Sequence, residues 1–274
     1  MSYGANHVLR GIDLEIARGE AVVLLGPNGA GKSTTIEILE GFRRPSSGSV
    51  EVLGVDPATA GDAWRARVGL VLQSWRDHAK WRVRELLDYL GGFYAPFSDV
   101  VPRPWPIDDL LAAVGLADDA DTPIGKLSGG RRRRLDVASG LIGRPELLFL
   151  DEPTAGFDPQ ARREFHDLLA TLSALNTTVL MTTHDLDEAA KVASRILMLV
   201  DGRIIADGSP EELRRQDFGR AEVCWFDGEQ HRAQPTDDPA EFLRVLLADR
   251  ARTVAELEVR RNSLEDVYLK AVGR

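Results

Sequence analysis

Residues 26–34 read GPNGAGKST and follow directly after the apolar run Ala21–Leu25. They fit the phosphate-loop pattern G-x-x-x-x-G-K-[ST] in the context that it needs, with a strand before it and a helix after it. Glycine adopts the backbone angles that let successive N–H groups curl around a triphosphate. Lys32 adds a cation for the β- and γ-phosphates, and the Ser33 hydroxyl can ligate Mg²⁺. The segment predicts a nucleotide-binding site; the alternative is a glycine-rich turn that binds nothing.

The bulk composition is that of a globular protein. The chain has 274 residues, of which 43% are hydrophobic and 28% are charged, which is enough for one large domain or two small ones. The net charge of −9 argues against a nucleic acid as the main partner.

The single cysteine, Cys224, excludes an internal disulfide and fits a reducing cytosol. No apolar run approaches the roughly 18–20 residues that span a bilayer, and the first residues show no signal-peptide pattern. Arginine greatly outnumbers lysine, a bias typical of GC-rich bacterial genomes, so we expect a bacterial source. Together with the single cysteine, this predicts a cytoplasmic bacterial protein.

Two carboxylates follow the short apolar run at residues 147–150, which reads LLFL and ends in Asp151 and Glu152. Such runs are typical of strands that are buried on both faces of a parallel sheet. Ligands bind at the carboxyl ends of these strands in open α/β sheets. Asp151 is therefore expected to hold Mg²⁺, and Glu152 to polarise an attacking water. The alternative is that both residues cap the helix that follows.

Two more strand ends carry polar side chains. Residues 177–183 form a β-branched, apolar run that ends in His184, and Gln73 closes the run at residues 68–72. A histidine at a strand's carboxyl end can contact a γ-phosphate or orient water. The Gln73 amide could reach Mg²⁺ or the water. Taken alone, the histidine would be a structural residue and the glutamine an ordinary strand end.

A second anion site is predicted at residues 127–131, which read LSGGR before a helix-compatible run from Arg132 to Ile142. Ser128 is a good N-cap, and Gly129 and Gly130 expose backbone N–H groups at the start of a helix. Most phosphate-loop enzymes have no such element. The alternative is an ordinary capped helix.

In this order, the segments resemble the ATP-binding cassette (ABC) transporter ATPases, over nearly all of residues 3–210. Residues 26–34 are similar to the Walker A loop, residues 127–130 to the signature, and residues 147–152 to the Walker B strand with its catalytic glutamate. Residues 155–158 look like the D-loop. The resemblance implies ATP and Mg²⁺ as cofactors, catalytic roles for Glu152, His184 (the switch histidine) and Gln73 (the Q-loop), and metal ligation by Ser33, Gln73 and Asp151. It implies ATP contacts from Tyr3 (stacked on adenine), Gly26, Pro27, Asn28, Gly29, Ala30, Gly31, Lys32, Ser33, Thr34, Ser128, Gly129, Gly130 and Asp158.

The implied fold is α/β: a phosphate-loop NTPase core of the RecA-like type with an antiparallel β subdomain, an inserted helical subdomain at about 74–140, and a small α+β appendage. We expect the ATPase domain at 1–215 and the appendage at 218–274. A hairpin is predicted at 196–206, turning at Asp201 and Gly202. In the tail, strands are predicted at 221–226 and 254–259, a turn-rich stretch up to Pro239, and helices at 241–249 and 263–271.

The inserted part has helix-spaced apolar positions from Trp81 to Tyr94. We expect its aromatic residues to pack mainly in the core. A minority could form a groove that accepts a helix from a membrane subunit. The aromatic residues in question are Trp75, Trp81, Tyr89, Phe93 and Phe97.

Three departures from the family pattern stand out. Arg131 occupies the signature's fifth position, where Gln is usual, and Phe157 stands where Leu is commoner. The strand that normally precedes Tyr3 is missing, so we expect either a longer native N-terminus or a first sheet that lacks an edge strand.

Four consecutive arginines at residues 131–134 invite a nucleic-acid interpretation. On a helix, however, consecutive side chains point about 100° apart and spread around the circumference. We therefore expect salt bridges and a solvated face, and no nucleic-acid partner.

The resemblance implies a machine built from more than this chain. ATP is sandwiched between the phosphate loop of one subunit and the signature of a second copy or a paralogous subunit, and an integral membrane permease forms the transport path. The chain would then lie peripherally on the inner face of the plasma membrane. The tail's ending at residues 262–269, NSLEDVYL, looks like that of the antibiotic- and multidrug-export branch. The alternatives are a soluble cassette ATPase that acts as an assembly factor or scaffold, and the motor of an importer.

Overall fold

The computed structural model describes residues 1–3, 6–71, 78–154, 157–174, 177–216, 221–228, 230–248, 254–260 and 268. Contacts divide the chain into two compact units, Met1–Ile205 and Ala206–Arg274. The predicted boundary between an ATPase domain and an appendage, at residues 215–218, stays a prediction. In the described part of the chain, no helix is long and apolar enough to cross a membrane.

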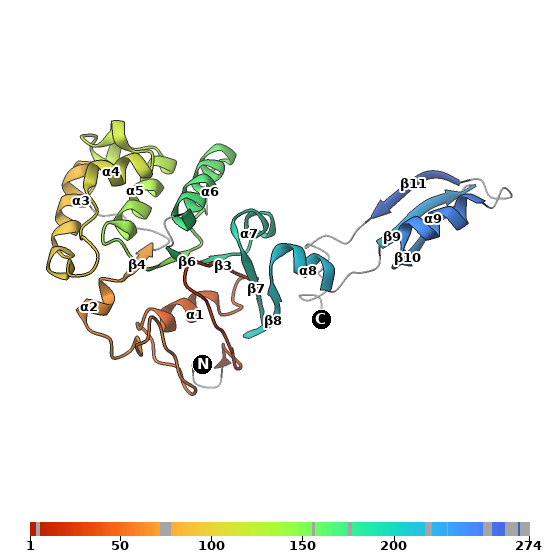
Figure 1. The fold of residues 1–274 in the computed structure, drawn as a ribbon, viewed down its shortest axis with the longest axis horizontal. Coiled ribbons are helices and arrows are strands. Elements are labelled where there is room, and N and C mark those ends of the chain that lie inside the picture. The colour runs from red at the N-terminus through yellow and green to blue at the C-terminus, as the bar shows by residue number, and fades with distance from the viewer. Residues whose placement is uncertain are drawn as a thin grey trace. The chain divides into compact units, whose positions relative to one another are not determined.

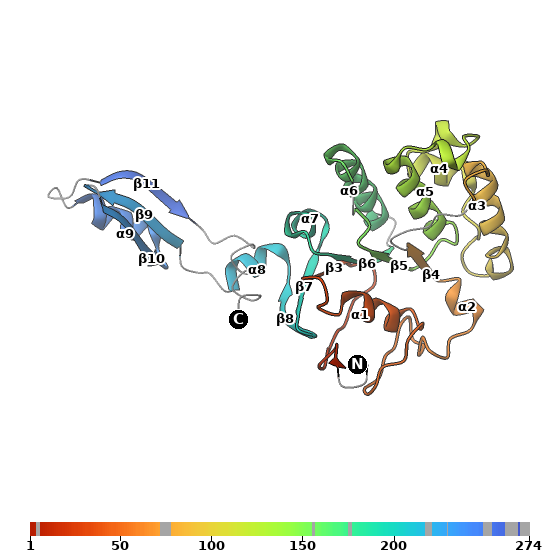
Figure 2. The ribbon, with the colours of Figure 1, turned by 180° about the vertical axis from the view of Figure 1, so that it is seen from behind.

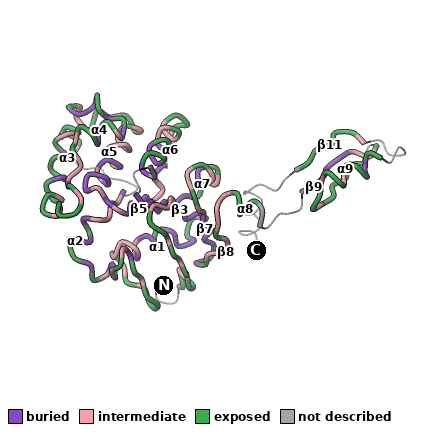
Figure 3. The backbone as a smooth tube through the Cα atoms, in the orientation of Figure 1, coloured by how far each residue is buried: buried purple, intermediate pink, exposed green. Residues whose placement is uncertain are grey.

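A six-stranded sheet is the centre of the first unit (Figure 1). Its order is β4-β5-β6-β3-β7-β8, and the first four of its strand pairs are parallel. The strands are β3 (Ala21–Leu25), β4 (Val68–Val71), β5 (Leu147–Asp151), β6 (Thr178–Thr183), β7 (Arg195–Val200) and β8 (Arg203–Gly208). Because β3, β5 and β6 are interior strands covered on both faces, their continuous apolar runs are buried, as the purple stretches of Figure 3 show. The predicted hairpin is confirmed as β7 and β8, which turn at Asp201 and Gly202.

Helices cover both faces of this sheet. Figures 1 and 2 show α1 on one face, and α6 and α7 on the other. Parallel strands need such crossovers, because each strand must return to the same edge before the next begins. The carboxyl ends of β3, β5 and β6 therefore meet at one edge. The helices of the unit are α1 (Lys32–Leu39), α2 (Asp62–Arg65), α3 (Val83–Gly92), α4 (Ile107–Ala113), α5 (Gly129–Leu141), α6 (Pro159–Ala174) and α7 (Leu186–Val192).

The predicted helical subdomain is present as α3, α4 and the N-terminal part of α5, with short 3₁₀ turns at Ala95–Phe97, Ala117–Asp119 and Ile124–Lys126. The expectation that its aromatic residues pack mainly in the core is wrong. Trp81 and Phe97 are only half-buried, and Trp75 lies outside the described residues. The remaining two are exposed. Tyr89 is 53% exposed and Phe93 is 59% exposed. They lie on the outer side of α3, whose Val83, Leu86 and Leu87 face inward and are buried.

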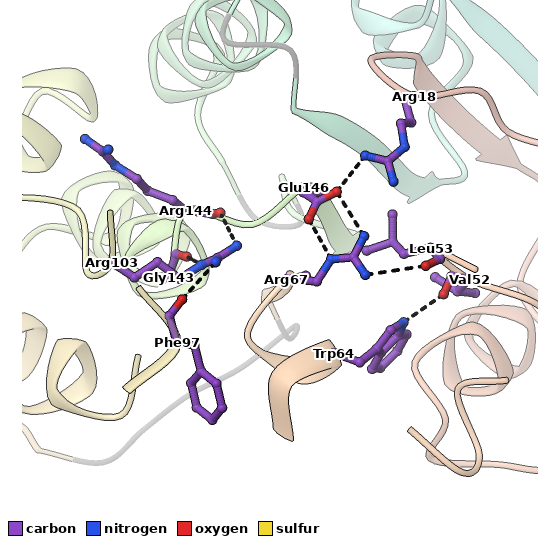
Figure 4. Close-up of polar contacts among 10 residues, drawn as sticks. All are labelled: Arg18, Val52, Leu53, Trp64, Arg67, Phe97, Arg103, Gly143, Arg144 and Glu146. Atoms are coloured by element: carbon purple, nitrogen blue, oxygen red, sulfur yellow. Dashed lines mark hydrogen bonds and ion pairs between the residues drawn. The ribbon is translucent and has the colours of Figure 1, made fainter. Parts of the chain in front are cut away.

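Three arginines connect segments that are distant in sequence near the start of β5 (Figure 4). Arg67 donates to both oxygens of Glu146, at 2.6 and 3.1 Å, and Arg18 donates to the same carboxylate at 2.7 Å. These guanidinium groups lower the pKa of Glu146, Arg67 more than Arg18. Arg103 donates to the Gly143 carbonyl at 2.6 Å, just beyond the end of α5. A cation at this place also complements the helix dipole.

The first residues form a small antiparallel hairpin, β1 (Ser2–Tyr3) and β2 (Asn6–His7). Val52 and Val55 form a single antiparallel bridge. Between them, residues 11–17 alternate between half-buried apolar and exposed polar positions but are assigned to no strand. The predicted antiparallel subdomain is thus short, and a cavity of about 120 Å³ lies between this segment and the central sheet, lined in part by Leu14, Ile16 and Phe149.

The second unit contains the predicted α+β appendage. Strand β9 (Ala221–Asp227) pairs with β10 (Gln230–Thr236) on one side and β11 (Val254–Arg260) on the other, both antiparallel. Helix α9 (Pro239–Ala248) packs on this sheet around Trp225 and Leu246, and α8 (Pro210–Gln216) precedes it in the chain. The turn-rich stretch predicted before Pro239 is wrong, because that segment contains β10. The predicted last helix at 263–271 lies outside the described residues, except for residue 268.

Candidate functional site

The phosphate loop lies between β3 and α1, in the strand–loop–helix context that the sequence predicted. Gly29 and Gly31 have φ angles of 82° and 107°, which only glycine adopts without strain. At Gly26 a Cβ atom would lie 2.2 Å from the Leu199 carbonyl oxygen of β7. The loop therefore needs glycine at Gly26 for close packing, and at Gly29 and Gly31 for their backbone angles.

Lys32, the first residue of α1, is buried, with 5% of its surface exposed. Its Nζ donates to the carbonyl oxygens of Gly26 at 2.8 Å and Pro27 at 3.3 Å. It also lies 3.3 Å from Glu152 Oε1. A buried charge is stable only when it is paired and hydrogen-bonded, and these contacts meet that requirement. They also hold the ammonium group against the loop.

Asp151 ends β5 beside the phosphate loop. Ser33 Oγ donates to Asp151 Oδ2 at 3.2 Å, and Thr182 Oγ1 donates to Asp151 Oδ1 at 2.5 Å. Thr182 lies directly opposite Asp151 in the parallel pair of β5 and β6. The carboxylate is thus held in a fixed orientation next to the Ser33 hydroxyl, 118 residues away in sequence.

Glu152 has a φ angle of 42°, which is unusual for a non-glycine residue. Its N–H donates to Thr182 Oγ1 at 3.0 Å. Its Oε1 lies 3.3 Å from Lys32 Nζ and 3.4 Å from His184 Nδ1. The structure therefore brings together residues from three strand ends that were singled out separately in the sequence.

The alternative in which Asp151 and Glu152 cap the next helix is wrong. Helix α6 begins at Pro159, and the carboxylate at its start is that of Asp158. Asp158 Oδ1 accepts from the N–H groups of Gln160 at 2.9 Å and Ala161 at 2.8 Å. This leaves the Asp151 and Glu152 carboxylates free to face the phosphate loop.

The second predicted anion site begins α5. Ser128 is the N-cap, and its Oγ accepts from Arg131 N at 3.4 Å. Ser128 and Gly129 are exposed, and Gly130 is half-buried. Within the residues that the structure describes, no hydrogen bond or ion pair joins these three residues to the cluster around Lys32, so within one chain they form a separate surface.

Some predicted site residues have no described side-chain geometry. Gln73 lies outside the described residues, as do Ala155 and Gly156 of the D-loop segment. Tyr3 lies in β1, but its side chain is not described. In the phosphate loop, Asn28 is exposed, Thr34 is half-buried and Ala30 is buried.

Comparison with known proteins decides the family. The family model described as "ABC transporter" matches residues 9–155, which is more than half of the chain. The chain belongs to the ABC transporter family. The fluoroquinolones export ATP-binding protein of Mycobacterium tuberculosis H37Rv is 39% identical to it, over 98% of this chain and 89% of that protein. The Nod factor export ATP-binding protein I of Rhizobium meliloti 1021 is 34% identical, over 100% of this chain and 86% of that protein.

A solved structure agrees with these relatives. The structure of CbiO1 from Clostridium perfringens, described as part of the ABC transporter complex CbiONQ, has a TM-score of 0.65 and 28% identity, covering 76% of this chain and 84% of that chain. The fold is therefore that of an ABC ATPase cassette. This ABC protein binds ATP and hydrolyses it.

Sequence reasoning missed two polar residues around the ABC site. Thr182 was included only as part of a strand, although it bridges Asp151 and Glu152. Arg133 was treated only as one of four arginines, but its buried Nε donates to the Pro153 carbonyl at 2.7 Å. A hydroxyl near the carboxyl end of a buried strand was the available signal, although it does not distinguish Thr182 from the other three threonines of residues 177–183. No pattern in the sequence distinguished Arg133 from its neighbours.

The four arginines at 131–134 spread around α5, as predicted. Arg131 pairs with Asp119 at 2.8 Å, and Arg134 pairs with Glu164. Arg132 and Arg133 both approach Asp136, at 3.6 and 3.5 Å. The run is therefore used in ion pairs of the ABC fold, and forms no continuous basic patch.

Proposed function

We propose that this ABC ATPase is the motor subunit of an exporter for drugs, antibiotics or related compounds. The two relatives named above are both described as export ATP-binding proteins, and each aligns over more than four-fifths of its own length. Their named compounds differ, which fits a division of labour in which cargo is recognised by another subunit.

The cluster of Lys32, Glu152 and His184 is the observation that carries the catalytic assignment. In this proposal the Lys32 ammonium holds the β- and γ-phosphate oxygens, helped by the N–H groups of the loop. The Glu152 carboxylate orients the attacking water and takes its proton. His184 Nδ1, 3.4 Å from the same carboxylate oxygen, fixes the position of Glu152 and contacts the γ-phosphate.

The residues beside Glu152 fit a magnesium ion. Mg²⁺ prefers oxygen ligands, and Ser33 Oγ and Asp151 Oδ2 lie 3.2 Å apart at the entrance of the loop. Ser33, Asp151 and, by the family resemblance, Gln73 would hold the ion. When bound, Mg²⁺ neutralises charge that develops on the phosphates. Thr182 keeps the Asp151 carboxylate turned toward Ser33.

A second subunit completes the proposed site. Ser128, Gly129 and Gly130 are accessible at the start of the 13-residue helix α5, whose N-terminus favours an anion. Because they make no described contact with their own phosphate loop, we infer that they close on ATP bound by the partner subunit, either a second copy or a paralogue.

The partner in the membrane would dock on the helical part. Trp81, Tyr89 and Phe93 form a row of edge-to-face aromatic contacts, with ring centroids 5.3 and 5.2 Å apart. Two of these rings are more than half exposed, which is typical of an interaction surface. A permease helix packed on this row would place the protein on the inner face of a bacterial plasma membrane.

Replacement of Glu152 by Gln tests the proposed function. We expect Glu152→Gln to lower phosphate release by at least about 100-fold, the lower end of what a general base contributes. ATP should still bind, and should hold two copies together in size-exclusion chromatography. Glu51→Gln, which changes an exposed carboxylate in the same way, is the matched control. Wild-type turnover in Glu152→Gln would remove Glu152 from the chemistry.

A further inference from the structure

One buried carboxylate near the site has no role in the proposed chemistry. Glu188, on α7, is 2% exposed. Thr154 Oγ1 donates to its Oε1, and Thr183 Oγ1 donates to its Oε2 at 2.5 Å. Thr154 follows Glu152 by two residues, and Thr183 directly precedes His184. One carboxylate thus joins the segment that carries Glu152 to the segment that carries His184.

Helix capping by itself does not explain this carboxylate. Asp185 is the N-cap of α7, and its Oδ1 accepts from Glu188 N at 3.0 Å. In an ordinary capping box, the Glu188 carboxylate would accept from the N-cap N–H. Here Asp185 N donates at 3.1 Å to the Thr183 hydroxyl, which in turn donates to Glu188. The carboxylate is directed toward the strand ends instead.

The segment that carries Glu152 needs such support. Its φ angle of 42° is one that a non-glycine residue keeps only where its surroundings impose it. Three hydrogen bonds do so. Glu152 N is bound by Thr182, the Pro153 carbonyl accepts from Arg133, and Thr154 is bound by Glu188. Of these partners, only Glu188 also holds the residue next to His184.

The chemistry of these contacts favours a rigid link. Hydrogen bonds from hydroxyls to a carboxylate are short and strong, and more so away from water. Thr154 and Thr183 are 5% and 3% exposed. His166 Nε2 lies 3.7 Å from Glu188 Oε1, and burial lowers the pKa of His166. The carboxylate is therefore enclosed by α6, α7 and both strand ends.

We propose that Glu188 is a positioning residue for ATP hydrolysis: through Thr154 and Thr183, its carboxylate sets the separation of Glu152 and His184. The inference rests on the proposed roles of Glu152 and His184. Misplacement of a reacting group by about 1 Å costs roughly 100-fold in rate. The phosphate loop is anchored on β3 and α1, so nucleotide binding is expected to change little.

The first test is Glu188→Gln, which keeps the size of the side chain and removes its charge. We expect kcat to fall by at least about tenfold, an intermediate loss for a misplaced group, while KM for ATP stays within about threefold. Asp187→Asn is the matched control, because Asp187 is the exposed neighbour on the same helix turn. Equal kcat in Glu188→Gln and wild type, or a loss that appears only in KM, overturns the proposal.

The second test uses Thr183, and it separates positioning from packing. Thr183→Ser keeps the hydroxyl and loses a methyl group, whereas Thr183→Val keeps the shape and loses the hydroxyl. We expect the serine variant to retain most of kcat and the valine variant to match Glu188→Gln. The reverse order overturns the proposal, because it would show that the site needs only the volume of the side chain. This pair remains informative if Glu188→Gln does not fold.

Glu152→Gln, assayed in parallel, separates the two conclusions. An inactive Glu152→Gln beside a fully active Glu188→Gln refutes only the positioning role. Retained turnover in Glu152→Gln refutes the proposed catalytic role, and with it the role of Glu188. Combined Glu188→Gln and Thr183→Val should be no slower than the slower single variant, because both break the same link.

Discussion

Replacement of Glu40 by Gln should stabilise the protein at alkaline pH. Glu40 lies at the end of α1, and its Oε1 is buried with no hydrogen-bond partner among the described residues. Burial raises its pKa from 4.5 to about 8, with smaller contributions from the charges of Asp151 and Glu37. Between these two pH values the folded protein binds a proton that the unfolded chain releases. Stability is therefore lost as the pH rises from about 4.5 to about 8.

The size of this effect follows from the pKa difference. A change of about 3.5 in pKa corresponds to at most about 5 kcal/mol, at roughly 1.4 kcal/mol for each unit. Because part of the Glu40 side chain is open to water, we discount this to about 1–3 kcal/mol. For a domain of this size, 1 kcal/mol moves the unfolding temperature by about 2–4 °C. Glu40→Gln should thus unfold roughly 2–12 °C above wild type at pH 9.

Thermal unfolding without nucleotide or Mg²⁺, followed at pH 5, 7 and 9, tests this expectation. The difference between Glu40→Gln and wild type should shrink as the pH falls toward 5, where Glu40 is protonated in the folded protein. Glu51→Gln, an exposed carboxylate, should stay within about 0.5 kcal/mol of wild type at every pH. A gap between Glu40→Gln and wild type that is the same at pH 5 and pH 9 would refute the reasoning.

Two further outcomes can be checked by unfolding measurements. Gly26→Ala should cost about 3 kcal/mol or more, because its Cβ would meet the Leu199 carbonyl oxygen at 2.2 Å and backbone would have to move. Gly29→Ala has open space around it but a φ of 82°, so it should cost only about 1–2 kcal/mol. Equal losses would contradict this argument from close packing. Glu146→Gln should cost about 1 kcal/mol at pH 7, less than the roughly 1.5–3 kcal/mol of a hydrogen bond to a charged group, because this ion pair is partly open to water. Arg67 lowers the pKa of Glu146, so this loss of stability should persist down to about pH 4.5 and fade only below it. A loss of stability that increased as the pH fell would show that the ion pair is not its cause.

Predictions that depended on short stretches of sequence agree with the structure. The phosphate loop, the strand that ends at Asp151, the hairpin at Asp201 and the cap of α5 by Ser128 all lie where expected. Each depends on contacts within a few residues, or on burial of one continuous run. Such features are readable because periodicity and turn chemistry act locally.

Predictions that depended on a surface or on distant neighbours were less successful. Tyr89 and Phe93 are aromatic residues of the kind usually found in a core, but both are exposed. The buried face of α3 is formed by other residues, among them Val83, Leu86 and Leu87. Strand β10 was missed because its residues are almost entirely exposed and contain a proline. Its only strong determinant is pairing with β9, which is a property of the folded sheet.

The sequence by itself determined the family, the phosphate loop and the identity of Lys32, Asp151, Glu152 and His184 as candidates. Tertiary structure alone decided that Lys32 and His184 share one oxygen of Glu152, that Asp158 rather than Asp151 caps α6, and that Glu188 joins two strand ends through Thr154 and Thr183. The physical reason is that a parallel sheet brings the carboxyl ends of β3, β5 and β6 to one edge, across sequence separations of 31 residues between Thr182 and Asp151 and 118 residues between Ser33 and Asp151. Hydrogen bonds across that edge join residues that are distant in sequence, so no local pattern of residue types predicts them.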